Sequence, residues 1–133
     1  MFDYQVVEGQ GEFTLLEAPS RAAQLIRLLE MARIGEYDNH LVYLYPEPQK
    51  NPSFHIQYKK EWEVVLQIKD LAVLEQKTSP FPKGAQLPSA ERKALLAFFH
   101  SPYGKITTWE FILMTWGTNN PKRPVDLNLP IPE

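Results

Sequence analysis

Two runs in which every second residue is apolar, separated by only three residues, place the strongest constraint on the fold. The apolar positions are Phe54, Ile56 and Tyr58 in the first run and Trp62, Val64, Leu66 and Ile68 in the second. This period is typical of strands with one buried face. Keeping both apolar sets on one face pairs Tyr58 with Trp62 and leaves residues 59–61 as the turn. The turn lacks glycine, so we expect one strained residue at positive φ, and we expect Trp62 to be largely buried.

The polar face of this hairpin supplies the candidate catalytic residues. In the same register His55 lies across from Val65, and Glu63 is its diagonal neighbour. A histidine beside a carboxylate can act as a general base with an orienting partner. The alternative is a surface histidine that is exposed or partly paired. No phosphate-binding glycine loop or nucleophile motif accompanies the pair, so any activity that uses His55 and Glu63 stays open.

The residues before this hairpin predict three further elements. Alternation over residues 2–15 indicates an N-terminal hairpin, and an apolar stripe at helical spacing then predicts a helix that Ser20 caps and Gly35 ends. Residues 41–45 are almost all apolar or aromatic, which predicts a strand buried on both faces.

The residues after the hairpin predict a short strand or turn at 71–75, a proline-rich loop and two helices. Ser89 can cap the first helix, which Pro102 and Gly104 end. Thr107 and Glu110 have the spacing of a capping box for the second. This order predicts an α+β fold, with a mostly antiparallel sheet of short strands and helices packed on one face.

We expect a single domain over residues 1–120 and a proline-rich, extended tail over residues 121–133. Apolar residues occupy alternate tail positions, at Val125, Leu127, Leu129 and Ile131. This spacing predicts a strip that docks on its own domain or on a neighbouring chain, the alternative being a disordered terminus.

Composition excludes several classes of site. The chain has 133 residues, of which 44% are hydrophobic and 23% charged, and it has no cysteine. There can be no disulfide, cysteine nucleophile or thiolate metal site. The three histidines are far apart in sequence and in unlike contexts, so we expect no bound metal and no cofactor. The start of the chain lacks a basic region and a long apolar run, so we expect no signal peptide, no membrane span and a cytoplasmic location.

Basic residues interleaved with aromatic ones suggest a nucleic-acid interface. Residues 50–105 carry nine bases against five acids, and Lys50, Lys59 and Lys60 lie near Tyr58 and Trp62. Such surfaces can stack the bases of single strands. The alternative is that these aromatic side chains pack in the core, because they belong to the apolar face.

Several short segments resemble a small bacterial family, the domain of unknown function numbered four-one-six-zero. They are His40 to Pro46, Asn51 to Tyr58, Trp62 to Ile68, Leu71 to Leu74, Arg92 to Leu96 and Met114 to Trp116, within residues 40–116. The family's His-Phe-His element retains only its second histidine here, as His55, because Ser53 occupies the first position. Its turn glycine is also missing from residues 59–61.

The resemblance implies a function through partners. Members of the family are often one half of a two-gene module of the toxin–antitoxin type. The expected function is therefore a bacterial protein-interaction component of such a module, or of a mobile element, that binds another protein chain or itself. The alternatives are a small nucleic-acid-binding protein and an RNA-processing enzyme that uses His55 with Glu63 or Lys59.

Overall fold

The computed structural model describes residues 31–47 and 49–133, and Ala32–Glu133 form one compact unit. The hairpin predicted over residues 2–15 and most of the helix predicted from Ser20 lie outside the described residues. Among the described residues, no helix has both the length and the apolar character that crossing a bilayer requires.

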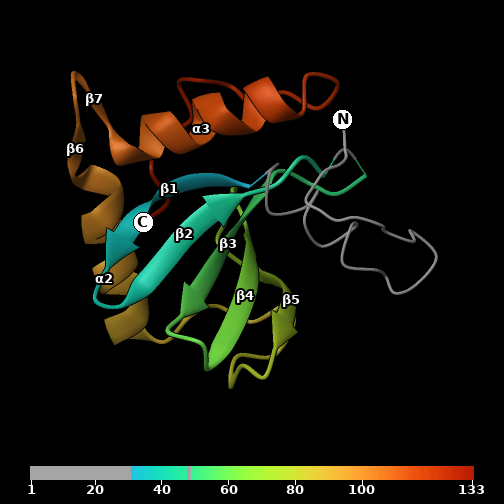
Figure 1. The fold of residues 1–133 in the computed structure, drawn as a ribbon, viewed down its shortest axis with the longest axis vertical. Helices are drawn as coiled ribbons and strands as arrows, with labels where there is room; N and C mark the ends of the chain where they lie inside the picture. Colours follow the sequence, from blue (N-terminus) through green and yellow to red (C-terminus); the bar gives the residue numbers. More distant parts are fainter. Residues whose placement is uncertain (1–30, 48) are drawn as a thin grey trace, which may run out of the picture. The chain divides into compact units, whose positions relative to one another are not determined.

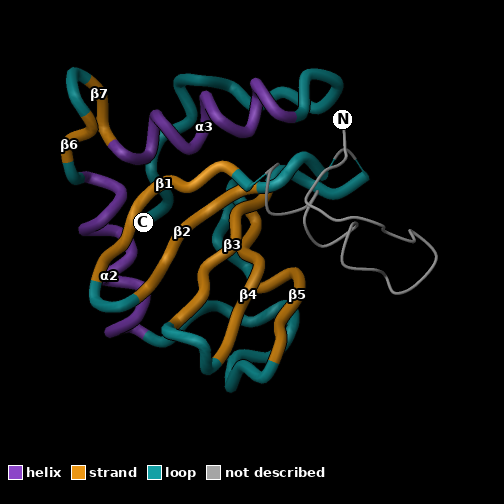
Figure 2. Tube along the Cα trace, in the orientation of Figure 1, coloured by secondary structure: helices purple, strands orange, loops and turns teal. Residues whose placement is uncertain are grey.

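A five-stranded antiparallel sheet forms the centre of this unit (Figure 1). Its strands follow one another in space as in sequence: β1 (Ala32–Tyr37), β2 (His40–Leu44), β3 (Ser53–Tyr58), β4 (Trp62–Gln67) and β5 (Val73–Lys77). Two helices follow, α2 (Ser89–His100) and α3 (Thr108–Asn119). The small hairpin of β6 (Pro102–Tyr103) and β7 (Ile106–Thr107) separates them (Figure 2). The fold is α+β, as the sequence predicts.

The β3–β4 hairpin has the predicted register. Tyr58 pairs with Trp62 and Ile56 pairs with Val64. Lys59 is the residue of the turn that adopts the expected positive φ, at 52°. Trp62 lies on the apolar face but is half-buried, because it sits at the end of the strand and stacks on Tyr58 with ring centroids 5.3 Å apart. The expectation that Trp62 is largely buried is therefore only partly met.

The first described strand corrects one prediction. Gly35 does not end a helix; it lies in β1 opposite Val42, just after a shift in strand pairing at Arg33. A Cβ atom added to Gly35 would lie 3.2 Å from the Phe98 ring, so the missing side chain gives α2 its close approach to the sheet. The strand over residues 41–45 is confirmed as β2, where Val42, Tyr43 and Leu44 are all buried.

The helix starts are partly as predicted. Thr107 caps α3, because its hydroxyl accepts a hydrogen bond from the Glu110 N–H while the Glu110 carboxylate accepts one from the Thr107 N–H, completing the predicted capping box. Ser89 is not the cap of α2. Pro88 occupies the N-cap position without any side-chain cap, and Ser89 is the first helical residue.

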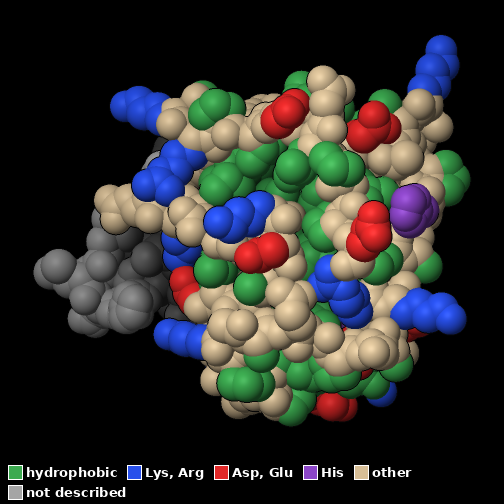
Figure 3. All heavy atoms as spheres, turned by 180° about the vertical axis from the view of Figure 1, so that it is seen from behind, with side chains coloured by type: hydrophobic (Ala, Val, Ile, Leu, Met, Phe, Trp, Pro, Cys, Tyr) green, Lys and Arg blue, Asp and Glu red, His purple; other side chains and the backbone are tan. Residues whose placement is uncertain are grey.

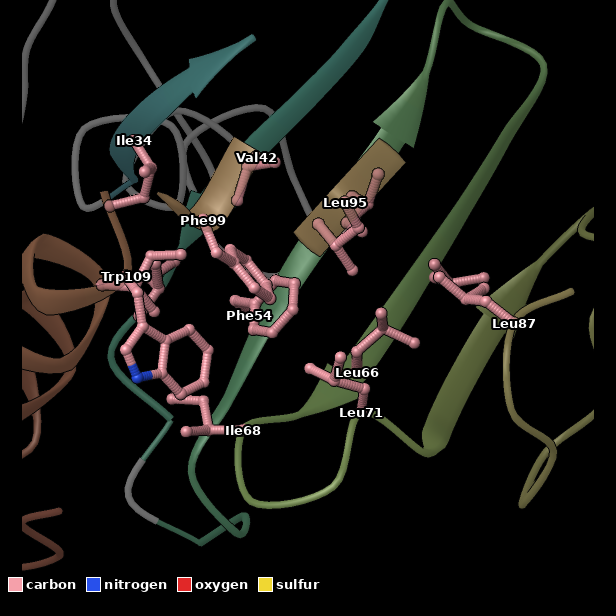
Figure 4. Packing of buried hydrophobic residues seen from close by; sticks show 14 of the residues in the cluster. Ile34, Val42, Phe54, Leu66, Ile68, Leu71, Leu87, Leu95, Phe99 and Trp109 are labelled. Atoms are coloured by element: carbon pink, nitrogen blue, oxygen red, sulfur yellow. The ribbon is translucent and has the colours of Figure 1, made fainter. Parts of the chain in front are cut away.

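The core lies between the apolar face of the sheet and the two helices (Figure 4). Phe54 and Phe99 meet edge to face there, and Phe99 lies against Trp109. The largest fully buried side chains are Trp109, Trp116, Phe54, Phe99, Leu44, Ile56, Leu66, Ile68, Leu71, Leu95, Ile112 and Leu113. The sheet and both helices therefore share one core.

The C-terminal tail docks on its own unit. The Trp109 indole N–H donates to the Leu129 carbonyl (2.8 Å), and the Trp116 indole N–H donates to the Arg123 carbonyl (2.7 Å). Val125, Leu129 and Ile131 pack against the core. Leu127 departs from the predicted alternation, because a turn lifts its side chain outward and leaves it 55% exposed.

Candidate functional site

The face of the sheet that points away from the helical core carries a buried polar cluster. Strand pairing places Tyr43, His55, Val65 and Glu75 side by side across β2, β3, β4 and β5. His55 in the middle of this row is only 4% exposed. A buried histidine on a sheet face needs polar partners, because an unsatisfied buried ring nitrogen costs free energy.

Two carboxylates supply those partners. His55 Nδ1 lies 3.1 Å from Glu63 Oε2, so the structure brings together the two catalytic candidates of the sequence. His55 Nε2 lies 2.7 Å from Glu47 Oε1. Glu47 was missed from the sequence because it lies in the proline-rich loop after β2, whose path no periodicity describes. His55 is thus neither exposed nor partly paired, since both ring nitrogens have a carboxylate partner.

The loop after β2 extends this pair into a chain of alternating charges, which we call the His55 network. It consists of Glu63, His55, Glu47, Lys50 and Glu75. Lys50 Nζ lies 2.6 Å from a carboxylate oxygen of Glu47 and 2.6 Å from one of Glu75. With His55 protonated, three carboxylates surround two cations, so nearly every charge is compensated.

The network shifts the pKa values of its members. Burial alone would lower the pKa of His55, but its hydrogen bonds to Glu47 and Glu63 outweigh burial and raise it. Burial would raise the pKa of Glu47, but hydrogen bonds with His55 and Lys50 lower it to about 2. The hydrogen bond to His55 lowers the pKa of Glu63, against the effect of burial, and a hydrogen bond from Tyr43 lowers it further. When His55 is protonated, each of its ring nitrogens donates to one carboxylate.

Aromatic rings enclose the imidazole of His55. Tyr43 stacks on it, with ring centroids 5.0 Å apart and planes 23° apart, and Tyr45 meets it edge-on at 5.2 Å. These contacts limit access of water to the imidazole.

The network also fixes the β2–β3 loop against the end of α3. The Glu47 N–H donates to the side-chain oxygen of Asn120 (2.7 Å), and Asn120 itself caps α3 by donating to the Trp116 carbonyl. Arg123 donates to the Lys50 carbonyl (3.0 Å). One loop therefore links the polar face of the sheet to the start of the tail.

This geometry favours a structural role for His55. A general base must offer a nitrogen lone pair to a substrate, and both nitrogens of protonated His55 hold carboxylates instead. In the described part of the chain, no group of three or more histidine and carboxylate side chains could hold a metal ion.

The three lysines suggested for nucleic-acid binding lie in two different settings. Lys50 is held by Glu47 and Glu75, whereas Lys59 and Lys60 are exposed at the β3–β4 turn. Lys59 Nζ lies 5.2 Å from the centroid of the Tyr58 ring, a cation–π contact. A polar hollow of about 80 Å³ at this end is lined by Lys60, Lys77 and Trp62, together with Glu61 and Glu63.

A second buried histidine, His40, lies near the β1–β2 turn. Its Nδ1 lies 2.8 Å from the Asp38 carbonyl oxygen, and its ring stacks on Tyr37 with centroids 4.7 Å apart. Its Nε2 lies 3.3 Å from Glu91 Oε1 at the start of α2. His100, at the end of α2, is exposed. The three histidines thus do not form one site.

A partly exposed apolar patch lies on β6 and the first two turns of α3. Tyr103 in β6 stacks on Phe111 in α3, with ring centroids 4.0 Å apart and planes 11° apart. Met114 follows Phe111 by three residues and so extends the same helix face. Tyr103 is 44% exposed and Met114 is 47% exposed. We call Tyr103, Phe111 and Met114 the α3 patch.

Comparisons of the chain with protein-family models, curated proteins and solved structures found no match. The resemblance over residues 40–116 therefore stays a prediction, and the functional argument rests on the geometry of the described residues.

Proposed function

We propose that this chain is a protein-interaction component of a two-gene module of the toxin–antitoxin type, and that it binds its partner through the α3 patch. The observation that carries the proposal is the stack of the exposed Tyr103 ring on the half-buried Phe111, with the exposed Met114 three residues after Phe111 on α3. Aromatic residues and methionine are enriched at the centres of protein interfaces. The closed His55 network supports a non-catalytic role.

The patch has the composition of an anchor rather than of scattered surface apolar residues. The described residues contain only three exposed large hydrophobic side chains, Tyr103, Met114 and Leu127, and two of them belong to the patch. The Tyr103–Phe111 stack fixes two rings against each other before binding, which lowers the conformational entropy lost on association. A partner that covers this stack would gain both apolar burial and aromatic contacts.

Co-expression with the product of the neighbouring gene tests this proposal. A tag on that product should retain the untagged chain at a fixed stoichiometry. The Met114→Asp variant should lose the complex, because it buries a charge in the interface. Leu127→Asp is the matched control, since it places the same charge on an exposed apolar residue outside the patch. Failure of the wild-type pair to co-purify, or survival of the complex in Met114→Asp, would contradict the proposal.

A second candidate function, binding of single-stranded nucleic acid, is favoured by one observation. Lys59 and Lys60 are exposed beside the Tyr58–Trp62 stack, and Trp62 is half-buried. Aromatic stacks beside cations can hold bases and phosphates of a single strand.

Fluorescence anisotropy of a labelled single-stranded RNA tests this alternative. Binding should weaken steeply with salt and should be reduced in a Lys59→Glu, Lys60→Glu double variant.

The RNA-processing alternative additionally requires His55 to release one of its two carboxylate partners. It predicts that a His55→Ala protein loses activity on RNA. Neither binding nor cleavage is expected if the α3 patch accounts for the function.

A further inference from the structure

A pocket of about 200 Å³ lies beside the C-terminal tail, on the same compact unit as the α3 patch but lined by other residues. Its apolar lining residues are Pro52, Ile68, Val125 and Leu129. Asn51, Gln67 and the exposed Lys69 also line it. Figure 3 shows that hydrophobic side chains gather on the face of the molecule opposite to the view of Figure 1.

The volume of the pocket selects the kind of occupant. Pockets for drug-sized ligands and cofactors typically span about 300–1,000 Å³. An apolar cavity of about 150 Å³ can hold a molecule of the size of benzene. A pocket of about 200 Å³ therefore suits a single aliphatic or aromatic side chain.

Such a side chain is carried by the same stretch of the tail that lines the pocket. Leu127 lies between Val125 and Leu129, the two tail residues that line the pocket. A turn holds it outward: the Leu129 N–H donates to the Asp126 carbonyl (3.0 Å), and the Asn128 N–H donates to the Asp126 carboxylate (2.8 Å). Leu127 is consequently 55% exposed, the largest exposure among the large hydrophobic side chains of the described residues.

The charges around the pocket and the turn are also complementary. Asp126 precedes Leu127 and is exposed, and Lys69, which lines the pocket, is also exposed. Within the described part of the chain, Lys69 has no ion pair or hydrogen bond. The adjacent carboxylate of Asp70 is engaged, because it accepts from the Gln67 side chain and the Ala72 N–H, both at 3.0 Å.

From this arrangement we infer that the chain forms a two-fold symmetric dimer in which Leu127 of each copy enters the tail pocket of the other. A two-fold interface requires one patch to be complementary to itself, so that projection and pocket, and cation and anion, occur on the same surface. The tail patch meets both conditions: Leu127 lies beside the pocket, and Asp126 would approach Lys69 of the second copy. The dimer leaves the α3 patch for another partner, so this inference goes beyond the proposed function.

Sedimentation velocity and light scattering of the full chain, over a range of concentrations, test the dimer. The wild type should show a reversible monomer–dimer equilibrium. Leu127→Asp should weaken dimerisation about a hundredfold or more, because two buried leucines are lost and each contributes about a factor of ten or more. Met114→Asp, a charge on the α3 patch, should leave the dimer unchanged. Thermal melting should show that both variants remain folded.

A double-mutant cycle tests the orientation of the two copies. Lys69→Met and Asp126→Asn, which keeps the side-chain oxygen that accepts from the Asn128 N–H, should each weaken the dimer by about tenfold or less, and the double variant should lose less than the sum of the two single losses. A monomeric wild type at every concentration, a dimer that survives Leu127→Asp, or an equal loss in Met114→Asp would overturn the inference. So would strictly additive losses for Lys69→Met and Asp126→Asn. None of these outcomes depends on the neighbouring gene product, so failure of the dimer and failure of the proposed function are distinguishable.

Discussion

The imidazole Nε2 of His55, in the middle of β3, lies 2.7 Å from the carboxylate of Glu47, in the loop that precedes that strand. The contact fastens a proline-rich loop onto a sheet face at the point where the ring is almost fully buried. Because Glu63 holds the other ring nitrogen, the imidazole acts as a cationic bridge between two carboxylates. This relationship leads to the first two predictions.

Stability should depend on pH through His55 and Glu47. The raised pKa of His55 gives stability that is fully present below about pH 6.5, the pKa of an unfolded-state histidine, and is lost as pH rises through the folded-state value. The pKa of Glu47, lowered to about 2, gives stability that is present above about pH 4.5 and is lost as pH falls toward 2. Urea unfolding across pH should therefore show highest stability between about pH 4.5 and 6.5. His55→Gln should flatten the decline above pH 6.5, and an unchanged decline in that variant would contradict the assignment.

Removal of the Glu47 side chain should lower the free energy of unfolding far more than removal of the Glu75 side chain. Glu47→Ala leaves His55 and Lys50 without a buried partner, and removal of one member of a buried ion pair typically costs about 3–5 kcal/mol. Glu75→Ala is the matched control, because it removes a carboxylate that also contacts Lys50 but has a side chain 48% exposed, so it should cost about 1 kcal/mol or less. Denaturant unfolding of both variants measures the difference. Equal decreases in the free energy of unfolding for Glu47→Ala and Glu75→Ala would contradict the claim that His55 holds the β2–β3 loop through Glu47.

Removal of the tail should lower the stability of its own unit. Truncation after Asn120 uncovers the indole N–H groups of Trp109 and Trp116, which donate to tail carbonyls, and the apolar surface under Val125. The melting temperature should fall, because buried donors lose their partners and apolar area returns to water. Leu127→Asp, which changes an exposed tail side chain, should melt like the wild type at concentrations where both are monomeric. A truncated chain with an unchanged melting temperature would show that tail docking contributes no stability.

Gly35→Ala should destabilise the contact between β1 and α2. The added methyl would lie 3.2 Å from the Phe98 ring, and Phe98 is stacked against Tyr37 with ring centroids 5.0 Å apart, which limits its movement. Overpacking of this kind costs about 1–3 kcal/mol. Shortening the neighbour in a Gly35→Ala, Phe98→Leu double variant should recover part of the loss in a double-mutant cycle. Additive effects of the two changes would argue against direct contact.

The alternation of apolar and polar residues is sufficient to predict the register of the β3–β4 hairpin, because only one register buries all the apolar side chains on the same face. The pairing of Tyr58 with Trp62 and the positive φ of Lys59 both follow from it. The same logic placed His55 and Glu63 on one face close enough to interact, and they are in contact. Local capping rules likewise identified the Thr107–Glu110 box, which depends on four adjacent residues alone.

The missed features depend on contacts between distant segments. The apolar stripe that ends near Gly35 predicts a helix end where the structure has β1. The turn after β1 places Asp38 and Asn39 at positive φ, a conformation that Asp and Asn tolerate. The backbone of Glu47, which contacts His55, is held by a hydrogen bond to Asn120, a residue 73 positions away. No local pattern contains such a contact. The α3 patch is similar, since Tyr103 and Phe111 meet only because the β6–β7 hairpin folds back onto α3.

Isothermal titration of the chain with the neighbouring gene product tests most directly whether the α3 patch, rather than His55, carries the function. The comparison uses the wild type, Met114→Asp and His55→Gln at a temperature where all three are folded. We predict that Met114→Asp reduces affinity by at least about tenfold, while His55→Gln binds like the wild type. Unchanged binding by Met114→Asp together with loss of binding by His55→Gln would contradict the account and would return the functional role to the His55 network.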